Sequence, residues 1–298
     1  MNDRQLRSNP DRIPGAPTPR IHSVEVDGTQ LYAEVRGSGP AALLIHAGGE
    51  DAEEWRPTAE RLDGFTVVTY DRRGTLRSGR DAWPGQGSIQ HANDAAGLLR
   101  AIGISDTLVF GGSAGGIVAL RLALLHPTLV RCAIVYEAGL FAHVRDGEPF
   151  RRPADLALAA YLDDHPDDWV GAVHAFGRAI AALTTRGATS GNFLDPPPGR
   201  DWYATREDGN AEALVRDDIP ITSRERFDID EVAASPVELM FAYGTESLPI
   251  FRSIARELAA ARRSVPDRIE GGGHGIYLQP ELAAAYIRRK SRVCGGRT

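Results

Sequence analysis

The sequence has little of several things that would reveal a function directly. Only two of its 298 residues are cysteine, Cys132 in an apolar run and Cys294 in the polar tail. Two cysteines placed in this way cannot build a disulfide framework, so we predict free thiols in a reducing compartment. No run of 18 apolar residues occurs, and no transmembrane helix is therefore expected.

Positive charge and cofactor motifs are also scarce. The chain has 34 Lys and Arg against 40 Asp and Glu, a net charge of −6, and Lys290 is its only lysine. Nucleic acid binding needs a basic face, so this balance argues against a nucleic acid partner. No HExxH motif or Cys/His cluster has metal-binding spacing, and we expect neither a metal nor another cofactor. Residues 1–20 carry four prolines and lack the apolar stretch of a signal peptide. We therefore predict a disordered N-terminal lead-in and a cytoplasmic protein.

What the sequence does have is a regular alternation of short apolar runs with amphipathic stretches. A hairpin is expected over residues 22–37, with its turn at Asp27-Gly28. Strands buried on both faces are expected at 41–47, 65–71, 107–112, 132–138 and 237–244, with a last short one at 264–269. Helices are expected at 53–63, 90–102, 114–126, 248–262 and 280–290. The alternation predicts an α/β fold with a doubly wound, mostly parallel sheet.

The alternation breaks over residues 142–232. Helical stretches at 153–164 and 167–184 have no strand between them, and a Gly/Pro-rich piece (191–203) and a charged region follow. The segment is too long for an ordinary loop. We therefore predict a sheet domain formed by residues 21–141 and 233–291, with residues 142–232 as a helical cap inserted into it.

The sharpest chemical signal is the sequence GGSAG, which places Ser113 between an apolar strand and a helical stretch. A tight strand-to-helix turn exposes a serine hydroxyl at the carboxyl edge of a sheet, and flanking glycines allow that turn. A phosphate-binding loop is excluded because no lysine follows the glycines. Ser113 is the predicted nucleophile.

A serine nucleophile needs a base, and the chain offers eight histidines. His274 lies in GGGHG, after the last expected strand and before the last expected helix, and its loop would open at the same sheet edge. His126 precedes Pro127 at a helix end and is typical of a capping or surface residue. His46 ends a strand and is interpreted as structural. His274 is the predicted base.

Two backbone N–H groups are expected to stabilise the charge that develops on the substrate oxygen. One belongs to Ala114, the residue after the nucleophile. The other is assigned to Gly48 in the HAGGE loop (46–50), where glycines allow close backbone approach.

These motifs occur in an order that resembles the α/β-hydrolase superfamily from about residue 22 to residue 290. The carriers are LLIHAGG, YDRRGTLRS, FGGSAGG and GGGHG. The resemblance implies an α/β-hydrolase fold with a helical cap inserted after strand six, and the segment 142–232 corresponds to the variable cap of that superfamily.

The acid that completes such a site has two candidates. Most of the superfamily places it in a G-x-x-D turn after the seventh strand, but here the fourth position of that turn is Ser247, and Glu246 lies one residue early. Glu137 ends the apolar run AIVYEA, where a carboxylate is costly unless it is paired or used. The local sequence resembles zearalenone-type lactonases, which place a glutamate in a similar strand-end context. Glu137 is favoured, with Glu246 as the alternative.

Together these residues predict a serine-dependent carboxylic ester hydrolase, a lactonase or esterase that forms an acyl-enzyme with a bulky apolar small-molecule substrate. No nucleic acid or membrane partner is expected. A C–C bond hydrolase, a thioesterase or a perhydrolase would keep the same residues, and so would a ligand receptor with vestigial turnover. Trp202 and Trp169 in the cap are candidate substrate contacts, Trp202 because it lies in the Gly/Pro-rich segment.

Overall fold

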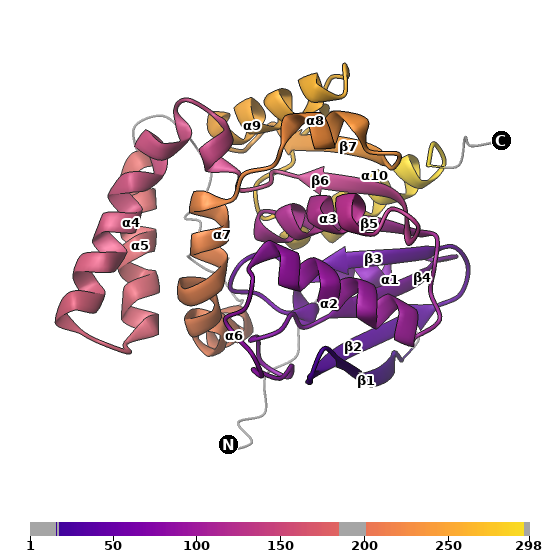
Figure 1. The fold of residues 1–298 in the computed structure, drawn as a ribbon, viewed down its shortest axis with the longest axis horizontal. Helices are drawn as coiled ribbons and strands as arrows, with labels where there is room; N and C mark the ends of the chain where they lie inside the picture. Colours follow the sequence, from indigo (N-terminus) through magenta and orange to yellow (C-terminus); the bar gives the residue numbers. More distant parts are fainter. Residues whose placement is uncertain (1–15, 17, 185–200, 295–298) are drawn as a thin grey trace.

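The fold is built on one sheet of eight strands. The computed structural model describes residue 16 and residues 18–184 and 201–294 (Figure 1), so most of the predicted lead-in, 1–20, lies outside the described residues. The strand order is β1-β2-β4-β3-β5-β6-β7-β8, and only β2 runs against its neighbours. The strands are β1 (Arg20–Val26), β2 (Thr29–Gly37), β3 (Ala41–Ile45), β4 (Thr66–Tyr70), β5 (Thr107–Gly112), β6 (Val130–Tyr136), β7 (Glu238–Gly244) and β8 (Asp267–Ile269).

The predicted hairpin and parallel strands are confirmed. Asp27 and Gly28 have φ angles of 47° and 76°, the positive pair that a two-residue type I′ turn requires. Successive residues of β3 face opposite sides of the sheet, with Leu43 in one apolar cluster and Leu44 in the other. Both clusters are closed to solvent, which explains why these strands are apolar throughout their length.

Helices cover both faces of the sheet (Figure 1). One face packs against α2 (Ser88–Ala101), α3 (Ala114–Leu125) and α9 (Pro249–Ala261). The other packs against the 3-10 turn η1 (Ala52–Trp55), α1 (Arg56–Glu60) and α10 (Pro280–Ser291). The chain is therefore doubly wound, as the alternation predicts.

The described residues between β6 and β7 are mostly helical. Figure 1 shows α4, α5, α6 and α7 beyond one end of the strands, whereas α8 lies beside α9. α4 and α5 pack against each other and share an apolar cluster with the segment that begins with α6. The elements are η2 (Phe141–His143), α4 (Gly147–Asp164), α5 (Trp169–Thr184), α6 (Asp201–Ala213), the π-helical turn η3 (Leu214–Asp218), α7 (Ile219–Arg224) and α8 (Ile229–Ala234).

One expectation for this segment is wrong. Trp202 was expected in an irregular stretch, but it lies in α6. The charged region after it, for which no element was predicted, forms η3, α7 and α8. Pro220 is the second residue of α7, two positions after the π turn. Its ring has no N–H to donate and would clash with the carbonyl four residues earlier, and the widened turn before it relieves both problems.

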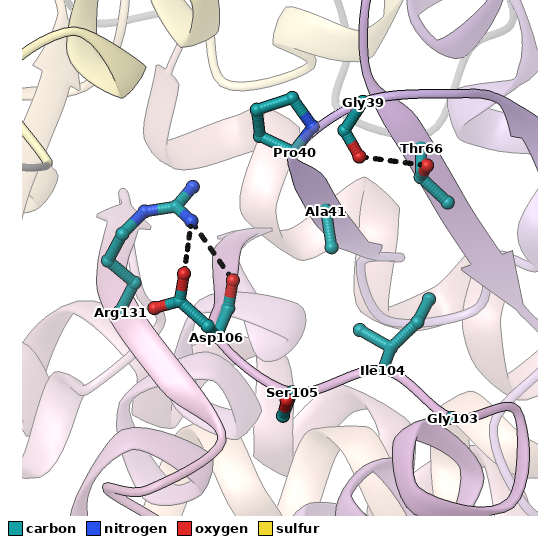
Figure 2. A pocket seen from close by; sticks show the side chains of 9 residues that line it. All are labelled: Gly39, Pro40, Ala41, Thr66, Gly103, Ile104, Ser105, Asp106 and Arg131. Atoms are coloured by element: carbon teal, nitrogen blue, oxygen red, sulfur yellow. Dashed lines mark hydrogen bonds and ion pairs between the residues drawn. The ribbon is translucent and has the colours of Figure 1, made fainter.

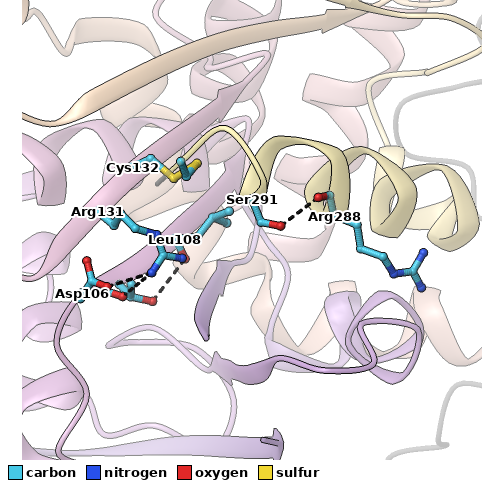
Figure 3. The surroundings of a disulfide bond; sticks show 8 residues. Asp106, Leu108, Arg131, Cys132, Arg288 and Ser291 are labelled. Atoms are coloured by element: carbon cyan, nitrogen blue, oxygen red, sulfur yellow. Dashed lines mark hydrogen bonds and ion pairs between the residues drawn. A yellow bond between two sulfur atoms is a disulfide. The ribbon is translucent and has the colours of Figure 1, made fainter. Parts of the chain in front are cut away.

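The prediction of free thiols is also wrong, because Cys132 and Cys294 form a disulfide (Figure 3). Cys132 points from β6 toward the face covered by α10, and Cys294 follows the end of that helix. Packing of α10 brings the two Cα atoms to 5.8 Å although 162 residues separate them in sequence. Local sequence context could not show this, because the proximity arises from tertiary packing.

We expect Cys294→Ser to lower the free energy of unfolding by about 2–5 kcal/mol, because a bond that closes so long a loop restricts the unfolded chain. Urea unfolding of the wild type with and without reductant, beside the variant, measures the effect. The variant should not respond to reductant. A wild-type midpoint that reductant leaves unchanged would contradict the prediction.

Candidate active site

Ser113 occupies a strained turn between β5 and α3. Its φ and ψ angles are 52° and −121°, a left-handed conformation that non-glycine residues rarely adopt. The glycines around it leave no room for side chains. A Cβ at Gly111 would lie 2.1 Å from the backbone oxygen of Gly115, and a Cβ at Gly115 would lie 2.5 Å from the backbone oxygens of Ile45 and His46. The turn thus has the geometry expected of a nucleophile elbow.

Strand pairing places Glu137 beside Ser113 at the carboxyl edge of the sheet. Gly112 pairs with Tyr136 in the parallel register of β5 and β6, so the residue that follows each strand leaves the sheet at the same level. The Ser113 N–H donates to the Tyr136 carbonyl at 3.1 Å, across the two strands. Glu137 also has a positive φ, 42°, and its side chain is fully buried.

His274 reaches this edge from the loop between β8 and the 3-10 turn η4 (Ile276–Leu278). Its Nδ1 lies 2.7 Å from Glu137 Oε2, while Glu137 Oε1 accepts the Gly244 N–H at 2.7 Å. The Phe251 ring stacks on the imidazole with the centroids 4.1 Å apart. Both oxygens of the Glu137 carboxylate are therefore hydrogen-bonded, and one face of the imidazole is packed against Phe251. These contacts fix the orientation of the His274 ring.

Glu246, the alternative acid, is not part of this arrangement. Its side chain is exposed, and its backbone N–H donates to the Gly272 carbonyl at 2.9 Å. The structure brings Glu137, not Glu246, against His274.

The loop that carries Gly48 is held by hydrogen bonds to its neighbour Ala47. Glu54 Oε2 accepts the Ala47 N–H at 2.7 Å. His46 Nε2 accepts the Arg72 backbone N–H at 3.0 Å, so its Nδ1 carries the proton and donates to the Ala47 carbonyl at 2.8 Å. Burial, with the nearby Arg72 charge, holds the pKa of His46 well below its ordinary value, so the imidazole is neutral. His46 is thus a support of this loop.

Ala114 supplies the other expected donor. As the first residue of α3 it has a backbone N–H with no acceptor inside the helix, at the positive end of the helix dipole. The close contact of Gly115 with the backbone of Ile45 and His46 places this helix end against the start of the Gly48 loop. Both predicted donors thus lie on segments that meet beside Ser113.

Comparison with known proteins agrees with the fold. The profile of the "Alpha/beta hydrolase family" matches residues 42–286. The chain belongs to this family. Among curated relatives, it is 40% identical over 117 residues to the uncharacterized hydrolase YraK of Bacillus subtilis, which covers 39% of this chain and 43% of that protein. It is also 40% identical over 114 residues to a putative carbamate hydrolase RutD of Azorhizobium caulinodans, which covers 38% of this chain and 42% of that protein. The chain thus spans less than half the length of either relative.

Solved structures support the fold of this α/β-hydrolase. The epoxide hydrolase CorEH superposes with a TM-score of 0.67 at 18% identity, covering 91% of this chain and 98% of that one. Est816, described as an N-acyl homoserine lactone degrading enzyme, gives a TM-score of 0.65 at 20% identity and covers 90% of this chain and 99% of that one. At these identities the likeness shows the fold alone.

Sequence reasoning missed Tyr136, which holds the loop that carries His274. Its hydroxyl donates to the Gly273 carbonyl at 2.6 Å, one residue before His274. Burial raises the pKa of this phenol, so it remains a donor at any working pH. An aromatic residue at the end of an apolar strand looked like ordinary core, and only the tertiary structure shows the bond.

The cap tryptophans do not gain a binding role from the structure. Trp169 is half-buried and packs against the apolar cluster that α4, α5 and the segment beginning with α6 share. The side chain of Trp202 lies outside the described part of the chain.

A cavity of about 410 Å³ opens at the opposite edge of the sheet from Ser113 (Figure 2). It lies at the amino ends of β3, β4 and β6, where Arg131 donates to the Asp106 carboxylate at 3.0 Å. Its lining residues are Gly39, Pro40, Ala41, Thr66, Gly103, Ile104, Ser105, Asp106 and Arg131. Ligands of open α/β sheets bind at the carboxyl edge, so this cavity is separate from the candidate site.

The buried Glu54 generates a pH prediction. Burial raises the pKa of its carboxyl well above the ordinary value, so the folded chain keeps a proton that the unfolded chain loses above about pH 4.3. Folding is then coupled to proton uptake, and the free energy of unfolding falls as pH rises from there toward the folded pKa. Glu54→Gln mimics the protonated carboxyl and removes this loss. Its stability advantage over the wild type should therefore grow from pH 5 to pH 8, by at most about 1.4 kcal/mol per pH unit.

Urea unfolding at both pH values measures that advantage. Glu246→Gln, at an exposed glutamate, is the control and should show no such growth. An advantage of Glu54→Gln that is the same at pH 5 and pH 8 would show that Glu54 is ionised in the folded protein.

Proposed function

We propose that this hydrolase cleaves carboxylic esters with Ser113 as nucleophile, His274 as base and Glu137 as the acid that orients the base. The observation that carries the proposal is the 2.7 Å contact of His274 Nδ1 with Glu137 Oε2, at the sheet edge where the strained Ser113 turn lies. Because the buried carboxylate of Glu137 holds the proton on Nδ1 of His274, Nε2 is the nitrogen that exchanges protons with a hydroxyl.

The reaction runs in two halves. The Ser113 Oγ attacks the ester carbonyl carbon while His274 Nε2 takes its proton, and the carbonyl oxygen becomes an oxyanion facing the Gly48 and Ala114 N–H groups. The tetrahedral intermediate collapses, and the leaving alcohol receives the proton from His274. Water then attacks the acyl-enzyme, gives its proton to His274, and the acid leaves as Ser113 recovers its proton. Glu137 stabilises the imidazolium in both halves.

We propose further that residues 142–232 act as a cap that selects a bulky apolar substrate, such as a lactone or a large ester. The support is contact with the edge that carries Ser113. A Cβ at Gly48 would lie 3.1 Å from the Asp218 Cβ, and a Cβ at Gly139 would lie 2.8 Å from Thr222 Cγ2. Side chains of η3 and α7 therefore lie directly on the segments that follow β3 and β6.

The relative named as a putative carbamate hydrolase favours a second substrate class. A carbamate presents the same carbonyl to a serine nucleophile, so no residue would change its role. Turnover of a phenyl carbamate, a lactone and a chromogenic ester of matched size would rank the three classes.

The cytoplasmic location remains a proposal. None of the helices in the described residues is long and apolar enough to cross a membrane. The prediction of a reducing compartment relied on free thiols, but Cys132 and Cys294 form a disulfide. Disulfides persist mainly under oxidising conditions. Alkylation of cells lysed directly into denaturant without reductant tests the location, because both cysteines are buried in the folded chain. Two blocked cysteines are expected in the cytoplasm, whereas unreacted cysteines would indicate an oxidising compartment.

Ser113→Ala should reduce hydrolysis of a chromogenic ester by about 10⁶-fold, because no other group can form the acyl-enzyme. Thermal unfolding should stay close to that of the wild type. A variant that keeps more than a tenth of wild-type turnover would exclude Ser113 as the nucleophile.

Glu137→Gln should lose about 10⁴-fold in turnover, because an amide cannot fix the imidazole tautomer or stabilise the imidazolium. Glu246→Gln is the matched control at the exposed glutamate and should stay within about threefold of the wild type. The reverse order of losses would place the acid after β7.

A further inference from the structure

The direction of the Gly48 N–H is set by the carbonyl of Ala47, because both belong to one planar peptide unit. In a trans peptide the C=O and the N–H point in opposite directions. The Ala47 carbonyl accepts from His46 Nδ1 at 2.8 Å and from Arg72 Nη2 at 3.0 Å. These two bonds hold the carbonyl on the side of Arg72, so the Gly48 N–H points away from that side.

The next peptide is held from the cap. Asp218, in the π turn η3, accepts the Gly49 N–H on Oδ2 at 3.0 Å. Its Oδ1 lies 2.7 Å from Nη1 of Arg72, the residue that also holds Ala47. Arg72 and Asp218 therefore connect the carbonyl before Gly48 to the N–H after it.

The Arg72–Asp218 pair is charged and closed to solvent. The two side chains are 1% and 2% exposed. Burial lowers the pKa of Arg72, but the Asp218 carboxylate, with smaller contributions from Asp217 and Tyr70, opposes burial and the pKa is raised overall. The geometry of such a buried ion pair is tightly constrained, because displacing either side chain leaves the other charge buried without a counter-ion.

We propose that Asp218 is a positioning residue of the oxyanion hole, through which the cap sets the direction of the Gly48 N–H. The inference rests on the proposed function, since it assigns Gly48 as an oxyanion donor. Asp218 positions Arg72, which in turn holds the Ala47 carbonyl. Asp218 also accepts the Gly49 N–H directly. A cap that lifts off the sheet would remove the Gly49 bond and leave Arg72 without its carboxylate partner, so full catalytic power requires the cap to be seated.

The rival explanation is that Asp218 only docks the cap. The adjacent Asp217 provides a matched control, because it lies in the same π turn and is also buried. Its carboxylate bonds His91 Nε2 and accepts from Trp83 Nε1 at 3.3 Å. Within the described residues it makes no hydrogen bond to the loop 46–50, so it docks the cap without touching the candidate oxyanion loop.

The experiment compares steady-state hydrolysis of p-nitrophenyl acetate by the wild type, Asp218→Ala, Asp218→Asn and Asp217→Ala. Misdirecting an oxyanion donor costs transition-state stabilisation and leaves ground-state binding largely intact. Asp218→Ala should therefore lose about tenfold to a hundredfold in kcat with KM within about threefold. Asp218→Asn keeps an acceptor for Gly49 and should recover part of kcat. Asp217→Ala should keep kcat within about threefold.

A second readout is the rate at which a fluorophosphonate labels Ser113, followed by intact mass, because the phosphoryl oxygen occupies the same oxyanion position. The labelling rates of the variants should follow the same order as their kcat values. Equal losses in Asp217→Ala and Asp218→Ala, or a loss confined to KM, would overturn the inference and leave the proposed function intact. A wild type that neither hydrolyses esters nor is labelled would overturn the proposed function, and the inference with it. If Asp218→Ala does not fold, Asp218→Asn decides by the same comparison.

Discussion

The candidate site depends on the parallel register of β5 and β6. Because Gly112 pairs with Tyr136, the next residue in each strand leaves the sheet at the same height. A shift of one residue would turn the side chains of one strand to the other face. Both Ser113 and Glu137 then adopt positive φ angles as the chain leaves the strand. The register thus fixes Ser113 and Glu137 at neighbouring positions, and the loop that carries His274, which follows β8, has only to reach across β7.

The sequence was informative wherever local rules govern the structure. The Asp27-Gly28 turn, the apolar runs buried on both faces and the glycines around Ser113 follow from sterics and periodicity, and each is found where expected. The carboxylate at the end of an apolar strand was also a sound signal, because burying Glu137 is costly unless a partner compensates it. These features could be predicted because their cause lies within a few residues.

The failures have the opposite origin. Cys132 and Cys294 meet only because α10 packs over the face of β6. Asp217 and Asp218 lie in the charged region after the Gly/Pro-rich piece, for which the sequence predicted no specific contacts. In the structure, Asp217 and Asp218 are buried against histidine and arginine side chains from segments more than a hundred residues away. Partners this distant leave no pattern in a single sequence.

The disulfide has a topological consequence. The covalent loop that it closes runs from β6 to the end of α10, and it contains Glu137, every helix between β6 and β7, and His274, whereas Ser113 and Gly48 lie outside it. A single backbone cut between α4 and α7 would therefore leave both fragments in one covalently linked molecule, with Glu137 and His274 on opposite sides of the cut. Gels run with and without reductant would distinguish such a nicked molecule from an intact chain.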